Sequence, residues 1–241
     1  MVGPPKKPDR PVVYRQASWL PVRESFSPSA LLAKARALGV EWTDVDVLLA
    51  QDLVPKKGST IYHGHEAHRD STTIPLAMLL KVERGVFAAQ TPSIEGLVPK
   101  CVPPFAPPGG RSKLWLSTDS SVTPLHYDDS ANYLTVLHGA KHVEFCAFGK
   151  HRARAPWHAG SPNHSDEKPS TTLRRVTLHA MDVLYLPPGY WHTVRSEPRT
   201  VATSYWFPQE TSGAFLERQN LMEAVIRLVR SRLRRQKPLD R

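Results

Sequence analysis

The sequence has few cysteines and no long apolar segment. Only Cys101 and Cys146 occur in 241 residues, too few for a disulfide framework, so a reducing setting is the expectation. No run approaches the roughly 18 apolar residues of a membrane-spanning helix. The first ten residues are basic and rich in proline, and they lack the apolar centre of a secretory signal. We therefore expect an intracellular protein, in the cytoplasm or nucleus, with no membrane partner.

Acidic residues are scarce relative to basic ones, 22 against 32, which gives a net charge of +10. Such an excess speeds encounters with polyanions, so nucleic acid is one candidate partner. Much of the excess lies near the C-terminus, in Arg218, Arg227, Arg230, Arg232, Arg234, Arg235, Lys237 and Arg241. A basic tail alone can account for the charge, so both interpretations stay open.

The chain divides into three parts by composition, and no internal repeat of 20 to 50 residues is visible. Residues 1–28 are rich in proline and charge and read as an extended arm. Residues 29–212 form the expected domain. Residues 213–241 have apolar side chains at helical spacing, including Leu221, Val225 and Leu228, and predict a basic amphipathic helix. This helix can pack against its own domain or pair with a second copy in a homodimer.

Two helices are expected on the N-terminal side of the domain. Ser27 is a capping residue, Pro28 suits a first turn, and the helical composition of 30–38 stops at Gly39. A second helix is predicted over 74–82, with leucines on one face.

Short apolar runs separated by turn residues dominate the sequence after Pro108. They lie at 114–116, 133–137, 142–148, 183–186 and 201–206. The segment 138–141 joins two of them at hairpin spacing. This pattern predicts a mainly β barrel or sandwich. The polar residues 150–170 interrupt it and are expected to form a surface loop.

Three residues in this β region have the chemistry of a metal site. His126 and Asp128 are two apart, and side chains at i and i+2 of a strand point to one face. His192 follows a proline-glycine turn and is a candidate third ligand. Each residue alone has an ordinary structural explanation. Together, two histidines and one carboxylate leave three coordination positions open, as in non-haem Fe(II) oxygenases.

Two other histidine motifs fit a metal site less well. His164 and Asp166 have the same spacing but lie in the polar 150–170 segment. His65 and His68 flank a glutamate without the i, i+4 spacing of a zinc-protease helix.

The motifs around the candidate ligands resemble those of a known family. Thr123–Asp128, Asn132, Gly139–Lys141 and Asp182–His192 are similar to segments of the JmjC/cupin-like hydroxylases. The pattern most resembles the asparaginyl hydroxylase that inhibits hypoxia-inducible factor, and the similarity covers about 74–207. It implies a double-stranded β-helix, also called a jelly-roll or cupin fold, with flanking helices on the N- and C-terminal sides.

The resemblance also implies a cofactor set and further site residues. Fe(II), 2-oxoglutarate as co-substrate and O2 are expected. By family position, Lys141 pairs with the distal carboxylate of 2-oxoglutarate, Thr123 and Asn132 hydrogen-bond the co-substrate, and Ser204 lies near the iron. A lysine inside a barrel indeed needs an anion to be tolerated. Four aromatic residues are candidates to line the substrate pocket, although each also suits a plain core: Tyr127, Trp191, Tyr205 and Trp206.

Two residues depart from the family pattern. Phe87 stands where a tyrosine hydroxyl helps to bind the distal carboxylate, so a hydrogen bond worth roughly 1.5–3 kcal/mol is missing unless another donor replaces it. Met181 stands where the turn before Asp182 usually has glycine, which suggests an altered turn. Neither departure removes a metal ligand.

We therefore expect an Fe(II)- and 2-oxoglutarate-dependent dioxygenase that hydroxylates a protein side chain, or demethylates it when the oxidised carbon is an N-methyl group. A hydroxylase of tRNA or another nucleic acid is the alternative with the same mechanism. A cupin-like scaffold without catalysis is an alternative of another class, prompted by Phe87 and Met181. A small-molecule cupin enzyme fits less well, because Lys141 would lose its purpose.

Overall fold

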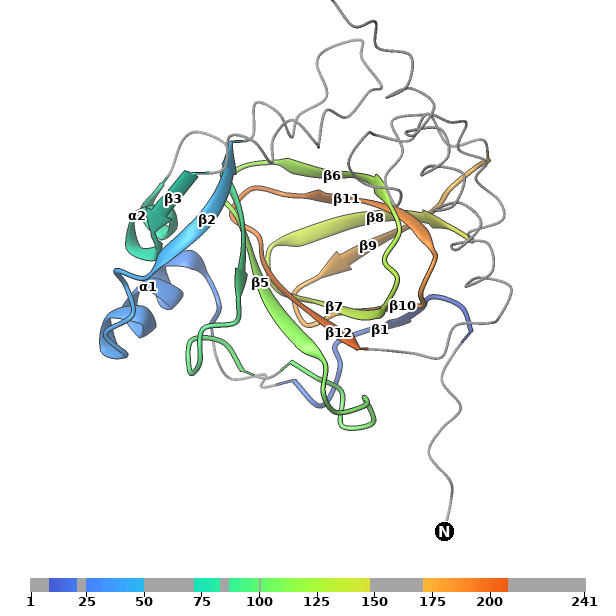
Figure 1. Cartoon of the computed structure of the whole chain (residues 1–241), viewed down its shortest axis with the longest axis horizontal. Helices are drawn as coiled ribbons and strands as arrows, with labels where there is room; N and C mark the ends of the chain where they lie inside the picture. Colours follow the sequence, from blue (N-terminus) through green and yellow to red (C-terminus); the bar gives the residue numbers. More distant parts are fainter. Residues whose placement is uncertain are drawn as a thin grey trace, which may run out of the picture.

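The computed structural model describes residues 9–20, 25–49, 72–82, 87–99, 101–147 and 171–207. These ranges contain two facing antiparallel sheets with two helices beside one end of the larger sheet (Figure 1). The larger sheet has the strand order β1-β10-β7-β12-β5-β4-β2-β3, and the smaller one β6-β11-β8-β9.

The strands of the larger sheet are β1 (Val12–Tyr14), β2 (Asp44–Leu49), β3 (Thr72–Pro75), β4 (Phe87–Pro92), β5 (Arg111–Ser117), β7 (Ala131–His138), β10 (Val183–Leu186) and β12 (Val201–Phe207). Those of the smaller sheet are β6 (Ser121–His126), β8 (Ala140–Cys146), β9 (Arg174–His179) and β11 (Trp191–Ser196). The expected mainly β, jelly-roll type of fold is confirmed.

All five predicted strands are present, as β5, β7, β8, β10 and β12. Strand β8 ends at Cys146, before the predicted end. The sequence analysis did not identify β1 to β4 or β9. Strand β9 is half-exposed and polar, so it lacks the apolar run that marks the others.

The first helix, α1 (Pro28–Ala37), confirms the prediction. The Ser27 hydroxyl accepts a hydrogen bond from the Ala30 amide at 3.3 Å, and Gly39 takes a positive φ of 69° after the helix. The second helix is shorter than predicted, because α2 spans Leu76–Lys81. Ile74 instead pairs with Val45 of β2, and Pro75 caps the helix.

Apolar side chains form two main cores on opposite faces of the larger sheet. The inner core fills the space between the two sheets and comprises Leu134, Val136, Val143, Phe145, Leu178, Leu184, Leu186, Val194 and Ala202. The outer core joins the other face of the larger sheet to α1, α2 and the segments around them. The candidate ligands belong with the inner core, since His192 pairs with inner-core Phe145 across the smaller sheet.

A tight turn at Gly139 carries the chain from β7 of the larger sheet to β8 of the smaller sheet and so places Lys141. The hairpin expected at 138–141 is therefore wrong, because the two strands pair with other partners in different sheets. Gly139 has a φ of +76°, and a Cβ there would lie 2.6 Å from the Thr200 hydroxyl. Only glycine fits this turn without a shift, because it alone adopts such a φ freely and leaves room for the neighbour.

Several predictions fall outside the described residues. They are the loop at 150–170, residues 1–8 and 21–24 of the 1–28 arm, and the amphipathic helix at 213–241 with its homodimer. The described part of the arm contains β1 of the larger sheet, and the domain boundaries stay predictions. Within the described ranges, neither helix is long and apolar enough to cross a membrane.

Candidate active site

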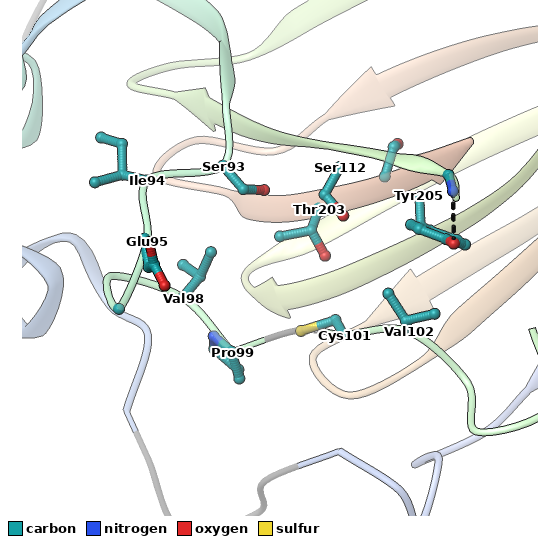
Figure 2. Close-up of a pocket in the computed structure, with 13 residues that line it drawn as sticks. Ser93, Ile94, Glu95, Val98, Pro99, Cys101, Val102, Ser112, Thr203 and Tyr205 are labelled. Carbon is teal, nitrogen blue, oxygen red and sulfur yellow. Dashed lines mark hydrogen bonds between the residues drawn. The ribbon is translucent and has the colours of Figure 1, made fainter. Parts of the chain in front are cut away.

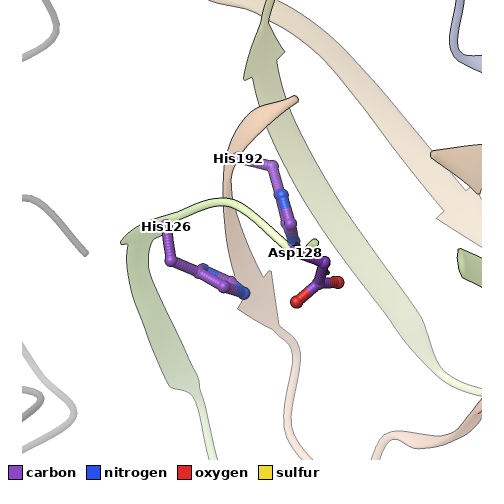
Figure 3. A group of neighbouring side chains, drawn as sticks. All are labelled: His126, Asp128 and His192. Atoms are coloured by element: carbon purple, nitrogen blue, oxygen red, sulfur yellow. Dashed lines mark ion pairs between the residues drawn. The ribbon is translucent and has the colours of Figure 1, made fainter. Parts of the chain in front are cut away.

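His126, Asp128 and His192 converge at one point between the sheets (Figure 3). His126 ends β6 and is the cross-strand partner of His192 in β11, so their rings lie side by side with centroids 4.1 Å apart. Asp128 follows β6, with its Oδ2 4.0 Å from His192 Nε2. One ligand atom from each residue lies within 4.8 Å of the others. The structure thus brings together all three candidate ligands named from the sequence, with Asp128 just beyond the end of β6 rather than in one strand with His126.

Hydrogen bonding prepares His192 to donate a lone pair. Its Nδ1 lies 2.9 Å from the Tyr190 carbonyl oxygen. A proton on Nδ1 therefore donates to that carbonyl and leaves Nε2 free toward the other candidate ligands. Burial, together with the nearby His126, lowers the pKa of His192 to about 4. The imidazole is thus neutral at pH 7, the form that binds a metal.

Asp128 is also held in place. Its Oδ2 accepts a hydrogen bond from the Trp206 indole nitrogen at 2.9 Å, and its backbone carbonyl accepts one from the Gly189 amide at 2.8 Å. We had expected Trp206 to line the substrate pocket, and it also orients a candidate ligand. No sequence signal pointed to this contact, which joins residues 78 positions apart.

The candidate ligands open into a cavity between the two sheets. Its wall contains all four residues that the family resemblance assigned to the co-substrate, together with Trp206. The lining residues are Trp115, Thr123, His126, Asp128, Asn132, Leu134, Lys141, Leu186, His192, Val194, Ser204 and Trp206.

Lys141 is the one lysine or arginine that is buried in the described part of the chain, with 5% of its surface exposed. Its ammonium donates to the Ser196 hydroxyl at 2.7 Å and lies 5.9 Å from the centroid of the Trp115 ring. Burial lowers its pKa to about 8. No carboxylate pairs with this cation among the described residues, so it suits a bound anion. Sequence reasoning did not identify Ser196.

The other three predicted co-substrate residues differ in whether their polar groups already have a hydrogen-bond partner. The Asn132 Oδ1 is buried and has no hydrogen-bond partner among the described residues. Such an orphaned acceptor calls for an explanation, and a ligand in the cavity supplies one. The Ser204 hydroxyl accepts from the Trp115 indole at 3.0 Å. The Thr123 carbonyl accepts from Thr193 at 2.7 Å.

Tyr127 and Trp191 do not line this cavity, contrary to expectation. Each is 1% exposed, and their rings meet edge to face with centroids 4.9 Å apart, in a cluster with Leu125 and Cys146. Trp191 adjoins His192 within β11, so strand alternation turns it to the opposite face. Tyr127 lies just after the end of β6 and packs against Trp191.

Tyr205 also lies elsewhere, on the outer face of β12 (Figure 2). Its hydroxyl accepts from the Gly110 amide at 2.9 Å and donates to the Pro107 carbonyl at 2.6 Å. It borders a second cavity of about 560 Å³ on this outer face, together with Cys101 and Thr203. Burial raises the pKa of the Cys101 thiol to about 11, so this cavity holds no reactive thiolate at neutral pH.

The two departures from the family pattern differ in outcome. Phe87 begins β4, and its side chain lies outside what the structure describes. Met181 has a φ of +72°, the left-handed region that favours glycine. The turn before Asp182 thus adopts a glycine-like backbone with a methionine in it, rather than a conformation suited to methionine.

The three candidate ligands fit Fe(II) by their donor chemistry. Two imidazoles and one carboxylate on one side of a cavity leave the remaining coordination positions open toward it. The neutral His192 and the hydrogen bonds at Tyr190 and Trp206 are the supporting contacts that metal sites require.

Comparisons with known proteins give partial matches to cupin-like and JmjC proteins. The family described as a cupin-like domain matches residues 158–213, a segment that contains His192. The Jumonji C domain-containing protein 5 of Drosophila melanogaster is 29% identical over 39% of this chain and 27% of its own length. The lysine-specific demethylase JMJ30 of Arabidopsis thaliana is 24% identical over 47% of this chain and 30% of its own length.

A solved structure, that of E. coli ycfD, covers 85% of this chain and 51% of that protein, with 17% identity and a TM-score of 0.49. The chain spans less than a third of the curated relatives named above. The likeness to the asparaginyl hydroxylase in particular stays a prediction. The cupin-like match and the JmjC relatives together support a cupin-like domain of the JmjC type.

Proposed function

We propose that this protein is an Fe(II)- and 2-oxoglutarate-dependent oxygenase that hydroxylates or demethylates a protein side chain. The observation that carries the proposal is a single cavity with three metal-ligand atoms within 4.8 Å of one another and, in its wall, a buried lysine that has no carboxylate partner among the described residues. Binding of the dianion 2-oxoglutarate needs both features, because the metal holds one end of the molecule and a cation binds the carboxylate at the other end.

His126, Asp128 and His192 would hold the iron, whose role is to let 2-oxoglutarate and O2 oxidise a C–H bond of the substrate. Lys141 would bind the distal carboxylate and carry the proton that keeps it cationic. Asn132 would offer its buried amide to the co-substrate. Leu134, Leu186 and Val194 form the apolar part of the wall and would exclude water from the oxidation.

A protein substrate is favoured by the relatives rather than by the cavity. JMJ30 is named a lysine-specific demethylase, which is a protein-modifying activity. Because this chain matches only 30% of JMJ30, both the protein substrate and the activity are proposed for this chain.

The test is an anaerobic titration of 2-oxoglutarate into the full chain with Fe(II), followed by the weak visible charge-transfer band of the chelate. The wild type is expected to show the band, and His126→Ala to lose it. A matched control is His142→Ala, which removes an exposed histidine that bonds Thr177 and Glu197 away from the cavity. That variant should keep the band.

The possible results separate the parts of the proposal. Iron uptake without a band means that the metal site exists and the co-substrate site does not. A wild type that takes up no iron contradicts the enzyme proposal and favours a cupin-like scaffold. A band that survives His126→Ala places the metal elsewhere.

A further inference from the structure

Lys113 lies beside the candidate metal site but has no part in the function proposed so far. It is on β5, two residues before Trp115, so both side chains point to the cavity face of the larger sheet. Its ammonium lies 5.7 Å from the centroid of the Trp206 ring, the same indole that holds Asp128. Lys113 is therefore at the rim of the cavity, one side chain away from a metal ligand.

This ammonium is half-buried and has no hydrogen bond or ion pair among the described residues. The charged groups that act on it are Arg111, on the same face of β5, and Asp128. Burial and the repulsion from Arg111 lower its pKa, while the attraction of Asp128 raises it. Asp128 already accepts a hydrogen bond from Trp206, and a bound metal would use its charge. Within the described ranges, the rim thus presents a cation that forms no ion pair and whose nearest acidic influence, Asp128, is already engaged.

The same arrangement is unfavourable for a cationic substrate. Methylated lysines are bound by aromatic faces through cation–π attraction. The two tryptophans of this site are already used by the protein's own cations, Trp206 by Lys113 at 5.7 Å and Trp115 by Lys141 at 5.9 Å. A methylammonium group arriving here would compete for the same rings against repulsion by two lysines.

Resting on the proposed function, we propose that the substrate is a peptide with a carboxylate beside an uncharged target side chain, and that Lys113 binds this carboxylate. Within the hydroxylase or demethylase class, the rim therefore selects hydroxylation of an uncharged residue over demethylation of a methyl-lysine. Arg111 is two residues away on the same face and adds to the positive field.

The rim favours a peptide over a nucleic acid. Nucleic-acid binding is built from many phosphate contacts along a surface. Among the residues that the structure describes, the basic groups at the rim are Lys113 and Arg111, and exposed Asp129 follows directly on the candidate ligand Asp128. A single carboxylate matches such a site better than a phosphate backbone does.

The test measures binding of four fluorescent probes to the full chain with Fe(II) and 2-oxoglutarate under anaerobic conditions. Three are nonapeptides of otherwise equal sequence: a central asparagine flanked by aspartates, the same centre flanked by lysines, and a central trimethyl-lysine flanked by serines. The fourth is a 12-nucleotide single-stranded RNA. The aspartate-flanked peptide should bind at least about tenfold more tightly than the other three at low salt.

Three variants assign the preference to Lys113. Lys113→Glu should remove the preference for aspartate flanks, and Lys113→Arg should retain most of it. Lys81→Glu makes the same change in net charge at an exposed position on α2 and should leave the preference intact. Equal binding of all probes, tighter binding of trimethyl-lysine or RNA, or a preference that survives Lys113→Glu overturns the inference.

The 2-oxoglutarate band of the same wild-type preparation separates this result from the proposed function. Where the band is present and the preference absent, the inference about Lys113 fails alone. Where the band is absent, the oxygenase proposal itself fails.

Discussion

The two faces of β12 show how one strand serves two purposes. Ser204 and Trp206 face the cavity, where Ser204 bonds Trp115 and Trp206 bonds Asp128. Tyr205 and Phe207 face the outer core, where their rings stack with centroids 5.8 Å apart. Neighbouring residues in the sequence thus belong to different environments, because successive side chains of a strand alternate.

The two faces of the larger sheet differ in whether their polar and charged groups have partners. The outer face packs against aromatic and aliphatic side chains beside the second cavity, and the Tyr205 hydroxyl has both a donor and an acceptor. The inner face keeps an orphaned acceptor at Asn132 and a buried cation at Lys141. Outer-face changes should therefore alter stability, and inner-face changes should alter ligand binding. Four substitutions test this separation.

Phe207→Ala should have the largest effect, a loss of about 3–5 kcal/mol in the free energy of unfolding. Phe207 is 1% exposed and stacks on Tyr133 and Tyr205, so alanine leaves a cavity in the outer core. Urea denaturation measures the loss. The folded fraction should still bind 2-oxoglutarate with the wild-type affinity; a large drop in that affinity would contradict the separation of the two faces.

Lys141→Met should raise the free energy of unfolding at pH 7 by about 2 kcal/mol while weakening 2-oxoglutarate binding. The pKa of Lys141 is about 8 in the folded protein, below the value of about 10.4 for an unfolded lysine. Below pH 8 the buried ammonium therefore destabilises the fold in full. This penalty disappears as the pH rises from 8 to about 10.4, so the advantage of methionine should shrink over that range.

Urea denaturation at pH 7 and pH 10 measures this change, with Lys81→Met as the exposed control. The same pKa predicts that the wild type binds 2-oxoglutarate with constant affinity below pH 8 and progressively more weakly above it. A Lys141→Met variant that is less stable at pH 7 would show that the hydrogen bond to Ser196 outweighs the cost of burial.

Trp206→Phe should weaken metal binding by 10- to 100-fold, the usual effect of removing a contact that orients a ligand. Phenylalanine keeps the ring and removes the N–H that donates to Asp128. Titration with Fe(II) or Mn(II) measures the affinity. Trp115→Phe is the matched control, because its indole donates to Ser204 rather than to a ligand. Equal losses in the two variants would mean that the hydrogen bond to Asp128 has no special role.

The fold and the metal triad could be predicted from the sequence because both rest on local patterns. Apolar runs identified β7 and β12, and the two-residue spacing of His126 and Asp128 pointed to two of the candidate ligands. Lys141 and Asn132 came from the family resemblance. Contacts between distant segments could not be predicted in this way: Ser196 meets Lys141 across 55 residues, and Trp206 meets Asp128 across 78.

Of the four aromatic residues expected at the substrate pocket, Trp206 lines the cavity of the candidate ligands, and Tyr127, Trp191 and Tyr205 are not among its lining residues. Trp191 adjoins His192 within β11, and adjacent side chains of a strand point to opposite faces. Alternation in β11 and β12 separates Trp191 from His192 and Tyr205 from Trp206. It does not apply to Tyr127 and Asp128, which lie after the end of β6, so their positions could not be predicted from strand spacing.

Met181→Gly should have the smallest effect, a gain of about 1 kcal/mol in the free energy of unfolding. A non-glycine residue with a φ of +72° carries about 1–3 kcal/mol of strain. Glycine removes that strain but adds roughly 0.5–1 kcal/mol of unfolded-state entropy and gives up packing against the outer core. Arg199→Gly is the matched comparison, because Arg199 has a φ of +59° and is exposed. If glycine stabilises the protein at 199 and destabilises it at 181, the packing of the Met181 side chain in the outer core contributes more than the strained turn costs. The departure from glycine is then an adaptation of the outer face that leaves the metal site unaffected.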